Sequence, residues 1–275
     1  MSFQTHDHGG VVYHTSSILD APGVTHGFST RLGGVSEGHF ASMNFQKHGS
    51  EPDSWENVLE NYRRFCGALG TDVQNVVRSK QVHEDTVRHV TGADRGKGIF
   101  VPRDYTADAL VTSEPGLNLM VFSADCIILL LHDPVTRSIG AVHAGWRGTA
   151  LDLPAKAVRE MGRLFGAKPG DVRVAIGAGI GSCCFETHDD VPDAMRTAFG
   201  GGVEAYIRPR GAKWTVDLKG VNAWRLREEG VDPGQIDVCA TCTACHTDLY
   251  WSHRIFGNKR GLQGALIGLK PEGVV

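Results

Sequence analysis

The sequence lacks a long apolar run and lacks a strong excess of charge of either sign. No segment of its 275 residues approaches the roughly 20 consecutive apolar residues that span a bilayer, so we expect no membrane partner. The formal net charge is only −3, which gives no global field favouring nucleic acid, and we expect no nucleic-acid partner. Residues 1–10 are polar and histidine-rich instead of basic and then apolar, so we expect a cytoplasmic protein.

Repeats, low-complexity tracts and linker-like stretches are also missing, which predicts one domain over residues 1–275. A hydrophobic content of 41% is ample for a buried core. Seven cysteines, an odd number in a chain expected in the cytoplasm, favour thiols or metal ligands over a disulfide framework. The 35 glycines make up about 13% of the chain against a usual ~7%, and their runs are typical of tight turns that let backbone approach a ligand.

Hydrophobic periodicity predicts many strands and few helices. Apolar residues at helical spacing predict helices over 55–69, 154–165 and 218–229, with Asp53 or Ser54 capping the first. Because strands and helices do not strictly alternate, we predict the α/β or α+β class, with a mixed sheet flanked by helices. The predicted strands are Val24–Ser29, Ala109–Thr112, Leu117–Phe122, Ile127–Leu131, Ile139–His143, Val172–Ile176 and Gly264–Leu269.

The most informative segment is 123–149. It places Cys126 at the start of one buried strand and His143 at the end of the next, with a turn at Asp133-Pro134 between them. If the two strands pair through that turn, Cys126 and His143 lie near the same end of a hairpin. A thiolate beside an imidazole is either a nucleophile with its base or two ligands of one metal.

A third candidate, His83, lies in Gln81-Val-His83, where we expect Gln81 and His83 on the same face of a strand. Together with Cys126 and His143 it completes a His/Cys/His set. Two imidazoles and a thiolate suit zinc, with a fourth position open to water or substrate, as catalytic zinc sites require. On the residues alone, both the metal site and the Cys–His nucleophile remain open.

Two other cysteine groups are present, Cys183-Cys184 and Cys239-Ala-Thr-Cys242-Thr-Ala-Cys245-His246. The Cys-x-x-Cys-His pattern resembles covalent haem attachment, which we do not expect without an export signal. The spaced cysteines would also allow an iron–sulfur or zinc knuckle, but no second pair lies at an obvious spacing. Adjacent cysteines seldom ligate one metal. We therefore expect Cys239, Cys242 and Cys245 to be ordinary thiols in a loop. We expect Cys183-Cys184 to lie in a backbone turn that lines a pocket.

Several polar residues near glycine turns are candidates for substrate binding. Arginines in such places suit bidentate capture of phosphate or carboxylate. The glycine run 176–181 can offer backbone amides to an anion, but it lacks the Lys-Ser/Thr of a Walker loop. The candidates are Arg31, Ser42, Asn44, Arg147 and Arg254.

Eight motifs, in this order along the chain, resemble a known family. They are His26-Gly-Phe-Ser-Thr-Arg-Leu-Gly-Gly-Val-Ser36, Ser42-Met-Asn44, Gln81-Val-His83, Ala107-Asp-Ala-Leu-Val-Thr112, Ala124-Asp-Cys126, His143-Ala-Gly-Trp-Arg-Gly148, Ile176-Gly-Ala-Gly-Ile-Gly-Ser-Cys-Cys-Phe-Glu186 and Cys242-Thr-Ala-Cys245. The chain resembles the YfiH/laccase-domain family, known as polyphenol oxidase-like proteins or purine nucleoside phosphorylases. The match covers about residues 24–269. Glu84 stands where the family usually has glycine, and Leu262 where it commonly has arginine, with Arg260 close by.

The resemblance implies an α/β fold related to the catalytic domain of deamidating toxins of the cytotoxic necrotising factor type. It also implies zinc bound by His83, Cys126 and His143. Activities implied for members are phosphorolysis of adenosine, inosine and methylthioadenosine, deamination of adenosine, copper-dependent oxidation of phenols, and an editing role in peptidoglycan precursor synthesis.

The leading hypothesis is a zinc-dependent purine nucleoside enzyme, with nucleoside and phosphate as partners and a monomer or small homo-oligomer as its state. Asp125 is then an acid/base candidate, or a residue that orients the site or caps its turn. For phosphorolysis the phosphate would contact the three arginines, and Ser42 and Asn44 would hold ribose or phosphate. The alternatives are a copper-dependent polyphenol oxidase, although the repeated His-x-His pairs of multicopper enzymes are missing, and a Cys–His hydrolase in peptidoglycan editing.

Overall fold

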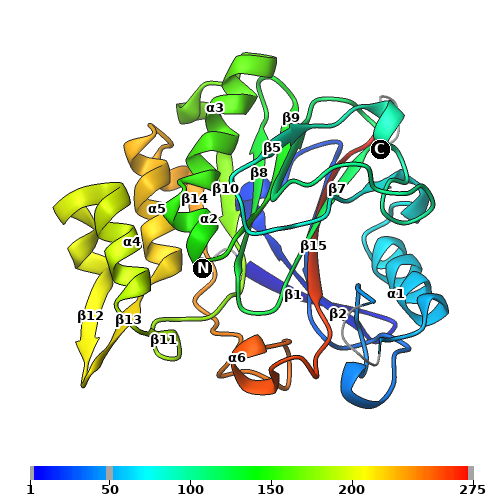
Figure 1. Cartoon of the computed structure of the whole chain (residues 1–275). Helices are drawn as coiled ribbons and strands as arrows, with labels where there is room; N and C mark the ends of the chain where they lie inside the picture. The colour runs from blue at the N-terminus through cyan, green and yellow to red at the C-terminus, as the bar shows by residue number, and fades with distance from the viewer. Residues whose placement is uncertain (1–2, 48–51, 272–275) are drawn as a thin grey trace.

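The computed structural model describes residues 3–47 and 52–271, and most of its strands lie in two six-stranded sheets (Figure 1). The first sheet has the order β1-β2-β3-β15-β7-β4. Its strands are β1 (Phe3–His8), β2 (Val11–Ser16), β3 (Val24–Ser29), β4 (Val76–Val77), β7 (Asn118–Ser123) and β15 (Gln263–Leu269).

The second sheet has the order β14-β10-β8-β9-β6-β5. Its strands are β5 (Val87–His89), β6 (Ala109–Thr112), β8 (Ile127–Asp133), β9 (Ser138–Ala144), β10 (Arg173–Ile176) and β14 (Ile236–Val238). Parallel and antiparallel pairs occur in both sheets, so the predicted class of mixed strands flanked by helices is confirmed. A three-stranded sheet contains β11 (Glu186–Thr187), β12 (Ile207–Arg210) and β13 (Lys213–Val216).

The two large sheets pack face to face, with helices on both outer faces (Figure 1). Side chains alternate along each strand, so Ile128 and Leu130 of β8 enter the core between the sheets, while Leu129 and Leu131 face the helices. Every residue of β8 is buried, which explains why this strand is a continuous apolar run in the sequence.

One helix covers the first sheet and four cover the second. Helix α1 (Trp55–Ala68) packs Tyr62 and Phe65 against β7 and β15. Its N-cap is Ser54, whose Oγ accepts a hydrogen bond of 3.0 Å from the backbone N–H of Asn57, as the sequence predicts. The helices on the second sheet are α2 (Trp146–Ala150), α3 (Leu153–Phe165), α4 (Asp190–Phe199) and α5 (Leu218–Glu228). A short helix, α6 (His253–Phe256), lies at one end of the sheets. None of the described helices combines the length and the apolar character needed to cross a membrane.

The hairpin predicted around Asp133-Pro134 is confirmed. Strands β8 and β9 pair antiparallel with Ile128 opposite His143. Cys126 directly precedes β8 in the turn that carries the chain from the first sheet to the second, and it therefore lies beside the end of β9. Cys126 and His143 thus lie where the chain passes between the sheets.

Candidate functional site

The structure brings His83, Cys126 and His143 together, as the sequence predicts. One potential ligand atom from each residue lies within 4.8 Å of the other two. Cys126 Sγ is 3.9 Å from His83 Nε2, and the two imidazole rings meet edge to face with centroids 4.9 Å apart. His83 does not lie on a strand, contrary to our expectation. It occupies a loop with a positive φ of 64°, so alternation along a strand does not place its side chain.

Asp108, which we did not predict as a site residue, positions both histidines. Its fully buried carboxylate accepts a hydrogen bond of 2.8 Å from His143 Nδ1. It also accepts bonds of 3.0–3.1 Å from the backbone N–H groups of Val82, His83 and Glu84. Because Nδ1 of His143 is engaged, its Nε2 remains for Cys126 or a metal. The only sequence signal was the position of Asp108 directly before a buried strand, in the Ala107–Thr112 motif.

Cys126 and His143 stabilise each other's charged forms. Burial alone favours the neutral thiol, but the charge and hydrogen bonds of His143 and His83 lower the pKa of Cys126 to about 6. Burial also disfavours imidazolium, yet Cys126 and Asp108 raise the pKa of His143 to about 9. In the metal-free protein near neutral pH, the pair is therefore thiolate and imidazolium. The low thiol pKa suits a nucleophile and a metal ligand equally.

The three residues fit a zinc ion. Their donor set is two imidazoles and a thiolate, and His143 donates its other ring nitrogen to a carboxylate, the arrangement common for metal-binding histidines. Gly145 leaves room beside them, since a Cβ at this position would lie 2.9 Å from Cys126 Sγ and 3.2 Å from His83 Cδ2. The same donors also accept copper.

Two cavities of different chemistry share His83 and Cys126. One has a volume of about 310 Å³ and is basic; among the described residues no carboxylate lines it. Its cationic lining residues are Arg78, Lys80, Arg103 and Arg260. The other, of about 360 Å³, is mainly apolar. Its apolar lining includes Trp146, Ile180, Phe185 and Leu218. Arg260 and Ala124 also line both, so the cavities adjoin at the cluster of His83, Cys126 and His143.

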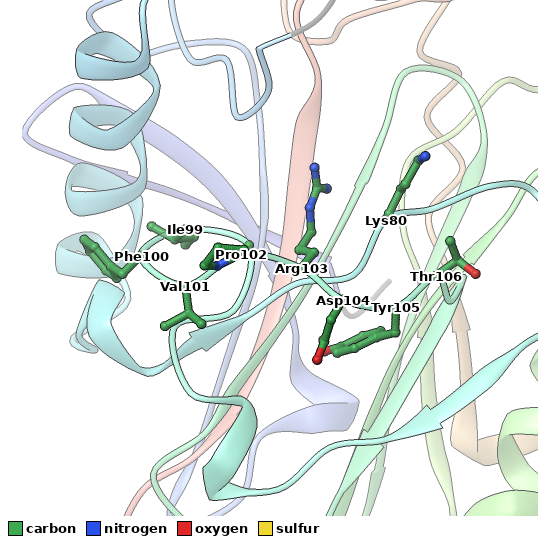
Figure 2. Close-up of a pocket in the computed structure, with 10 residues that line it drawn as sticks. Lys80, Ile99, Phe100, Val101, Pro102, Arg103, Asp104, Tyr105 and Thr106 are labelled. Carbon is green, nitrogen blue, oxygen red and sulfur yellow. The ribbon is translucent and has the colours of Figure 1, made fainter.

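The basic cavity adjoins a shallow groove of about 840 Å³ formed by Lys80 and the segment 98–106. Lys80 and Arg103 line both spaces. Figure 2 shows these two side chains extending to the same side of their segments, whereas Asp104 extends to the opposite side. Asp104 instead pairs with Lys97 at 3.0 Å. The two cations therefore remain directed toward the basic cavity.

Two of the predicted arginines lie near the cluster but do not line the basic cavity. Arg254 lines the apolar cavity, and its guanidinium donates to the carbonyl groups of Cys184 and Glu186, both at 2.9 Å. Arg147 is exposed, stacks on the Trp146 ring at 4.2 Å from its centroid, and lines neither cavity.

Arg31, Ser42 and Asn44 line neither cavity and instead form hydrogen bonds within the protein. The guanidinium of Arg31 donates to Ala41 O and Thr247 O at 2.8 Å. Ser42 Oγ accepts from the Gly34 N–H, and Asn44 is completely buried, with its amide donating to Asp53. Because their polar groups already have partners within the protein, we assign them a structural role in place of the substrate contacts we expected.

Asp125 also has its hydrogen-bonding capacity taken up. Its carboxylate accepts bonds from Thr243 Oγ1 at 2.6 Å, Ser252 Oγ at 3.0 Å and the Arg254 N–H at 2.7 Å. Its φ is 85°, and its backbone carbonyl accepts from the Ile180 N–H. Asp125 therefore joins three loops beside Cys126, which supports the turn-stabilising alternative more than acid/base chemistry.

Comparison with known proteins identifies the family. The profile of the family described as Multi-copper polyphenol oxidoreductase laccase matches residues 25–270. The chain belongs to this family. The chain is 36% identical to a protein named Purine nucleoside phosphorylase from Deinococcus radiodurans, over 92% of both chains. It is 33% identical to Purine nucleoside phosphorylase YlmD of Bacillus subtilis, over 89% of this chain and 88% of the relative.

The fold is also shared with a solved member of the family. The crystal structure of hypothetical protein YfiH from Bacillus licheniformis superimposes with a TM-score of 0.89 at 35% identity, covering 98% of this chain and 99% of that one. Agreement over nearly the whole length means that the two sheets and the loops between them belong to a family architecture.

Proposed function

We propose that this chain catalyses phosphorolysis of purine nucleosides, beside a zinc ion held by His83, Cys126 and His143. The observation that carries the proposal is that a basic cavity and an apolar cavity share His83 and Cys126, with His143 lining the basic one. One accommodates phosphate and the other a planar base, so both reactants can meet at one point. The names of the relatives support the same activity.

The basic cavity supplies the phosphate site. Lys80, Arg103 and Arg260 surround a space without a competing carboxylate among the described residues, and several cations can together neutralise a phosphate dianion. Leu262, which stands where the family commonly has an arginine, lines the same cavity. Arg260 on the same loop provides a positive charge there instead. The loop thus retains a means of binding an anion.

The apolar cavity supplies the base site. Trp146 and Phe185 offer aromatic surface for a purine, and Arg254 is at the cavity edge. In phosphorolysis a phosphate oxygen forms a bond to C1′ of the ribose as the bond from C1′ to the purine nitrogen breaks. The products are ribose 1-phosphate and the base, and the departing purine takes up a proton. Cys126 and His83 also line this cavity, so a purine bound in the cavity would lie beside them.

The chain's own residues control the protons of the site. Asp108 keeps a proton on Nδ1 of His143 and holds the loop of His83 in place. When bound, zinc supplies Lewis acidity and can lower the pKa of a water molecule to roughly 7, as deamination of adenosine to inosine requires. We include that deamination in the proposed function, because the hydrolysis of adenosine to inosine and ammonia uses the same base cavity and zinc ion and needs no phosphate.

A second candidate is a Cys–His hydrolase. The observation that favours it is the Cys126–His143–Asp108 series, in which a thiolate, its base and an orienting carboxylate are arranged as in cysteine hydrolases. Activity that persists after complete removal of zinc and disappears on alkylation of Cys126 would favour this candidate.

Incubation of the protein with adenosine, inosine or methylthioadenosine tests the proposed function. With phosphate, we expect free base and the corresponding ribose 1-phosphate; without phosphate, we expect only conversion of adenosine to inosine. Chromatography separates these products. Absence of turnover by metal-replete protein in both conditions would refute the proposal.

Replacement of Arg103 tests the position of the phosphate. We expect Arg103→Gln to raise the KM for phosphate about tenfold, because a hydrogen bond to a charged group contributes about 1.5 kcal/mol or more. The deamination rate should stay within twofold, since it uses no phosphate. Arg147→Gln is the matched comparison, as Arg147 is exposed outside both cavities. An equal rise in KM in both variants would argue against the basic cavity as the phosphate site.

A further inference from the structure

Four cysteines from two distant segments meet outside the site described above. Cys183 and Cys184 lie in the turn after the glycine run, and Cys242 and Cys245 lie in a loop some 60 residues later. The four sulfur atoms all lie within 4.8 Å of one another. Their spacing along the sequence gives no sign that these two groups meet.

The distances between sulfur atoms match a tetrahedral tetrathiolate site. Cys245 Sγ is 3.6 Å from Cys183 Sγ and 3.4 Å from Cys184 Sγ. Four thiolates at 2.3 Å from one zinc ion lie about 3.8 Å apart. The turn explains how adjacent cysteines both take part: the Cys184 N–H bonds to Gly181 O at 3.0 Å, and both thiols approach Cys245.

An N–H donor and three cationic side chains lie beside the cluster. The backbone N–H of Gly181 donates to Cys242 Sγ at 3.2 Å, a contact that stabilises a thiolate. A zinc ion with four thiolates carries a net charge of −2, and three cations are placed around this cluster. Arg210 donates to Cys183 O and Arg254 to Cys184 O, while the buried Lys219 ammonium donates to Cys239 O and Thr241 O.

We propose that Cys183, Cys184, Cys242 and Cys245 bind a second, structural zinc ion, separate from the His83–Cys126–His143 site. A structural role follows from the donor set, since four protein ligands leave no open position for substrate. Cys183 and Cys245 are exposed, so the ion can enter from solvent.

The second zinc ion would hold together one wall of the apolar cavity. Ile180 and Phe185, which line that cavity, lie on either side of the Cys183–Cys184 turn, three residues before it and one after it. The partner loop carries Thr243, whose N–H bonds to Gly179 O and whose hydroxyl donates to Asp125. A small apolar cluster of Ile180, Cys242 and Ala244 also joins the two loops. Zinc would therefore stabilise the wall and the Asp125 turn without contacting substrate.

Metal analysis of purified full-length protein tests the proposal independently of the proposed function. We expect two zinc ions per wild-type chain. Replacing both histidines, in the variant His83→Ala/His143→Ala, should leave one, and X-ray absorption of that variant should show four sulfur neighbours at about 2.3 Å. One zinc ion in the wild type and none in this variant would overturn the proposal, as would iron in place of zinc.

Two serine substitutions distinguish a cysteine of the cluster from a neighbouring cysteine outside it. Cys245→Ser should lose one zinc ion per chain and lower the melting temperature, while Cys239→Ser should keep both ions. Cys239 is the matched control, because it is a buried cysteine of the same loop outside the cluster. If Cys245→Ser does not fold, the zinc ions of the wild type can be counted instead. A mercurial reagent should release two zinc ions per chain, and protein without the reagent should retain both. Disulfides among the four cysteines, detected by mass spectrometry of unreduced protein, would contradict the proposal.

Discussion

Replacing Cys126 with alanine is expected to lower kcat/KM for phosphorolysis at least 1,000-fold, which corresponds to about 4 kcal/mol of transition-state stabilisation. The thiolate is one of three ligands in the proposed zinc site, so its loss leaves only His83 and His143 to hold the ion. It also removes the negative charge that stabilises imidazolium at His143. The measurement is steady-state turnover of inosine with saturating phosphate, together with the zinc content of the variant.

Cys239→Ser is the control for the general effect of removing a thiol, because Cys239 lies outside both proposed metal sites. It should retain turnover within twofold and should retain its zinc. The Cys126→Ala variant with turnover within tenfold of the wild type would contradict both the zinc mechanism and the Cys–His hydrolase. Chelation then separates these two: wild-type protein stripped of metal should lose activity and regain it on addition of zinc, whereas a cysteine hydrolase should not.

Replacing Asp108 with asparagine is expected to lower activity and zinc affinity by about 10- to 100-fold, the usual cost of losing the carboxylate behind a metal-binding histidine. Each oxygen of Asp108 accepts two hydrogen bonds, one pair from His143 and His83 and the other from Val82 and Glu84. An amide nitrogen at either position cannot accept them. The variant therefore leaves two N–H donors without their acceptor and weakens the hold on the loop of His83.

The same substitution should change the pH dependence of Cys126 alkylation in metal-free protein. In the wild type the pKa of Cys126 is lowered to about 6, so its thiolate is present above that pH and is lost as the pH falls through it. Asp108 helps to raise the pKa of His143. Without that charge His143 loses its proton at lower pH, offers less positive charge to Cys126, and the pKa of Cys126 should rise toward its ordinary value of about 8.5.

The rate of alkylation by iodoacetamide, followed at the Cys126 peptide by mass spectrometry, reports this shift. Asp104→Asn is the matched control, since it makes the same chemical change at an exposed carboxylate that pairs with Lys97. Its profile should match the wild type. Superimposable profiles for Asp108→Asn and the wild type would show that Asp108 does not govern the charge state of the pair.

The core elements could be predicted from the sequence because each carries its own local signal. Strands β3 and β6 begin and end at the predicted residues, and α1 begins at its predicted cap, since apolar runs and caps act over a few neighbouring residues. The outer strands β1 and β2 were missed. Strand β1 is mostly exposed at the sheet edge, so it needs few apolar residues and its sequence shows no clear strand pattern. Helix α4 was missed as well, because its buried residues are only Val191, Pro192 and Met195 and two aspartates stand in its first turn.

The candidate site was only partly predictable, because only some of its residues carry a local signal in the sequence. Cys126 and His143 were placed together because one hairpin connects them. Arg31 and Asn44 were expected at the site, but in the structure Arg31 donates to the carbonyl of Thr247 and Asn44 to the carboxylate of Asp53. The cations of the basic cavity come from separate loops, and nothing local distinguishes Lys80, Arg103 or Arg260 from any solvated surface residue.

The sequence by itself determined the mixed α/β class and the central hairpin, and it singled out His83, Cys126 and His143. Only the tertiary structure decided that Asp108 orients that set, that a basic and an apolar cavity adjoin there, and that four distant cysteines meet. The physical reason is the separation along the chain over which each feature is determined. Hydrophobic periodicity and capping depend on residues a few positions apart, whereas a buried hydrogen bond, a cavity wall or a set of ligands depends on how separate segments pack.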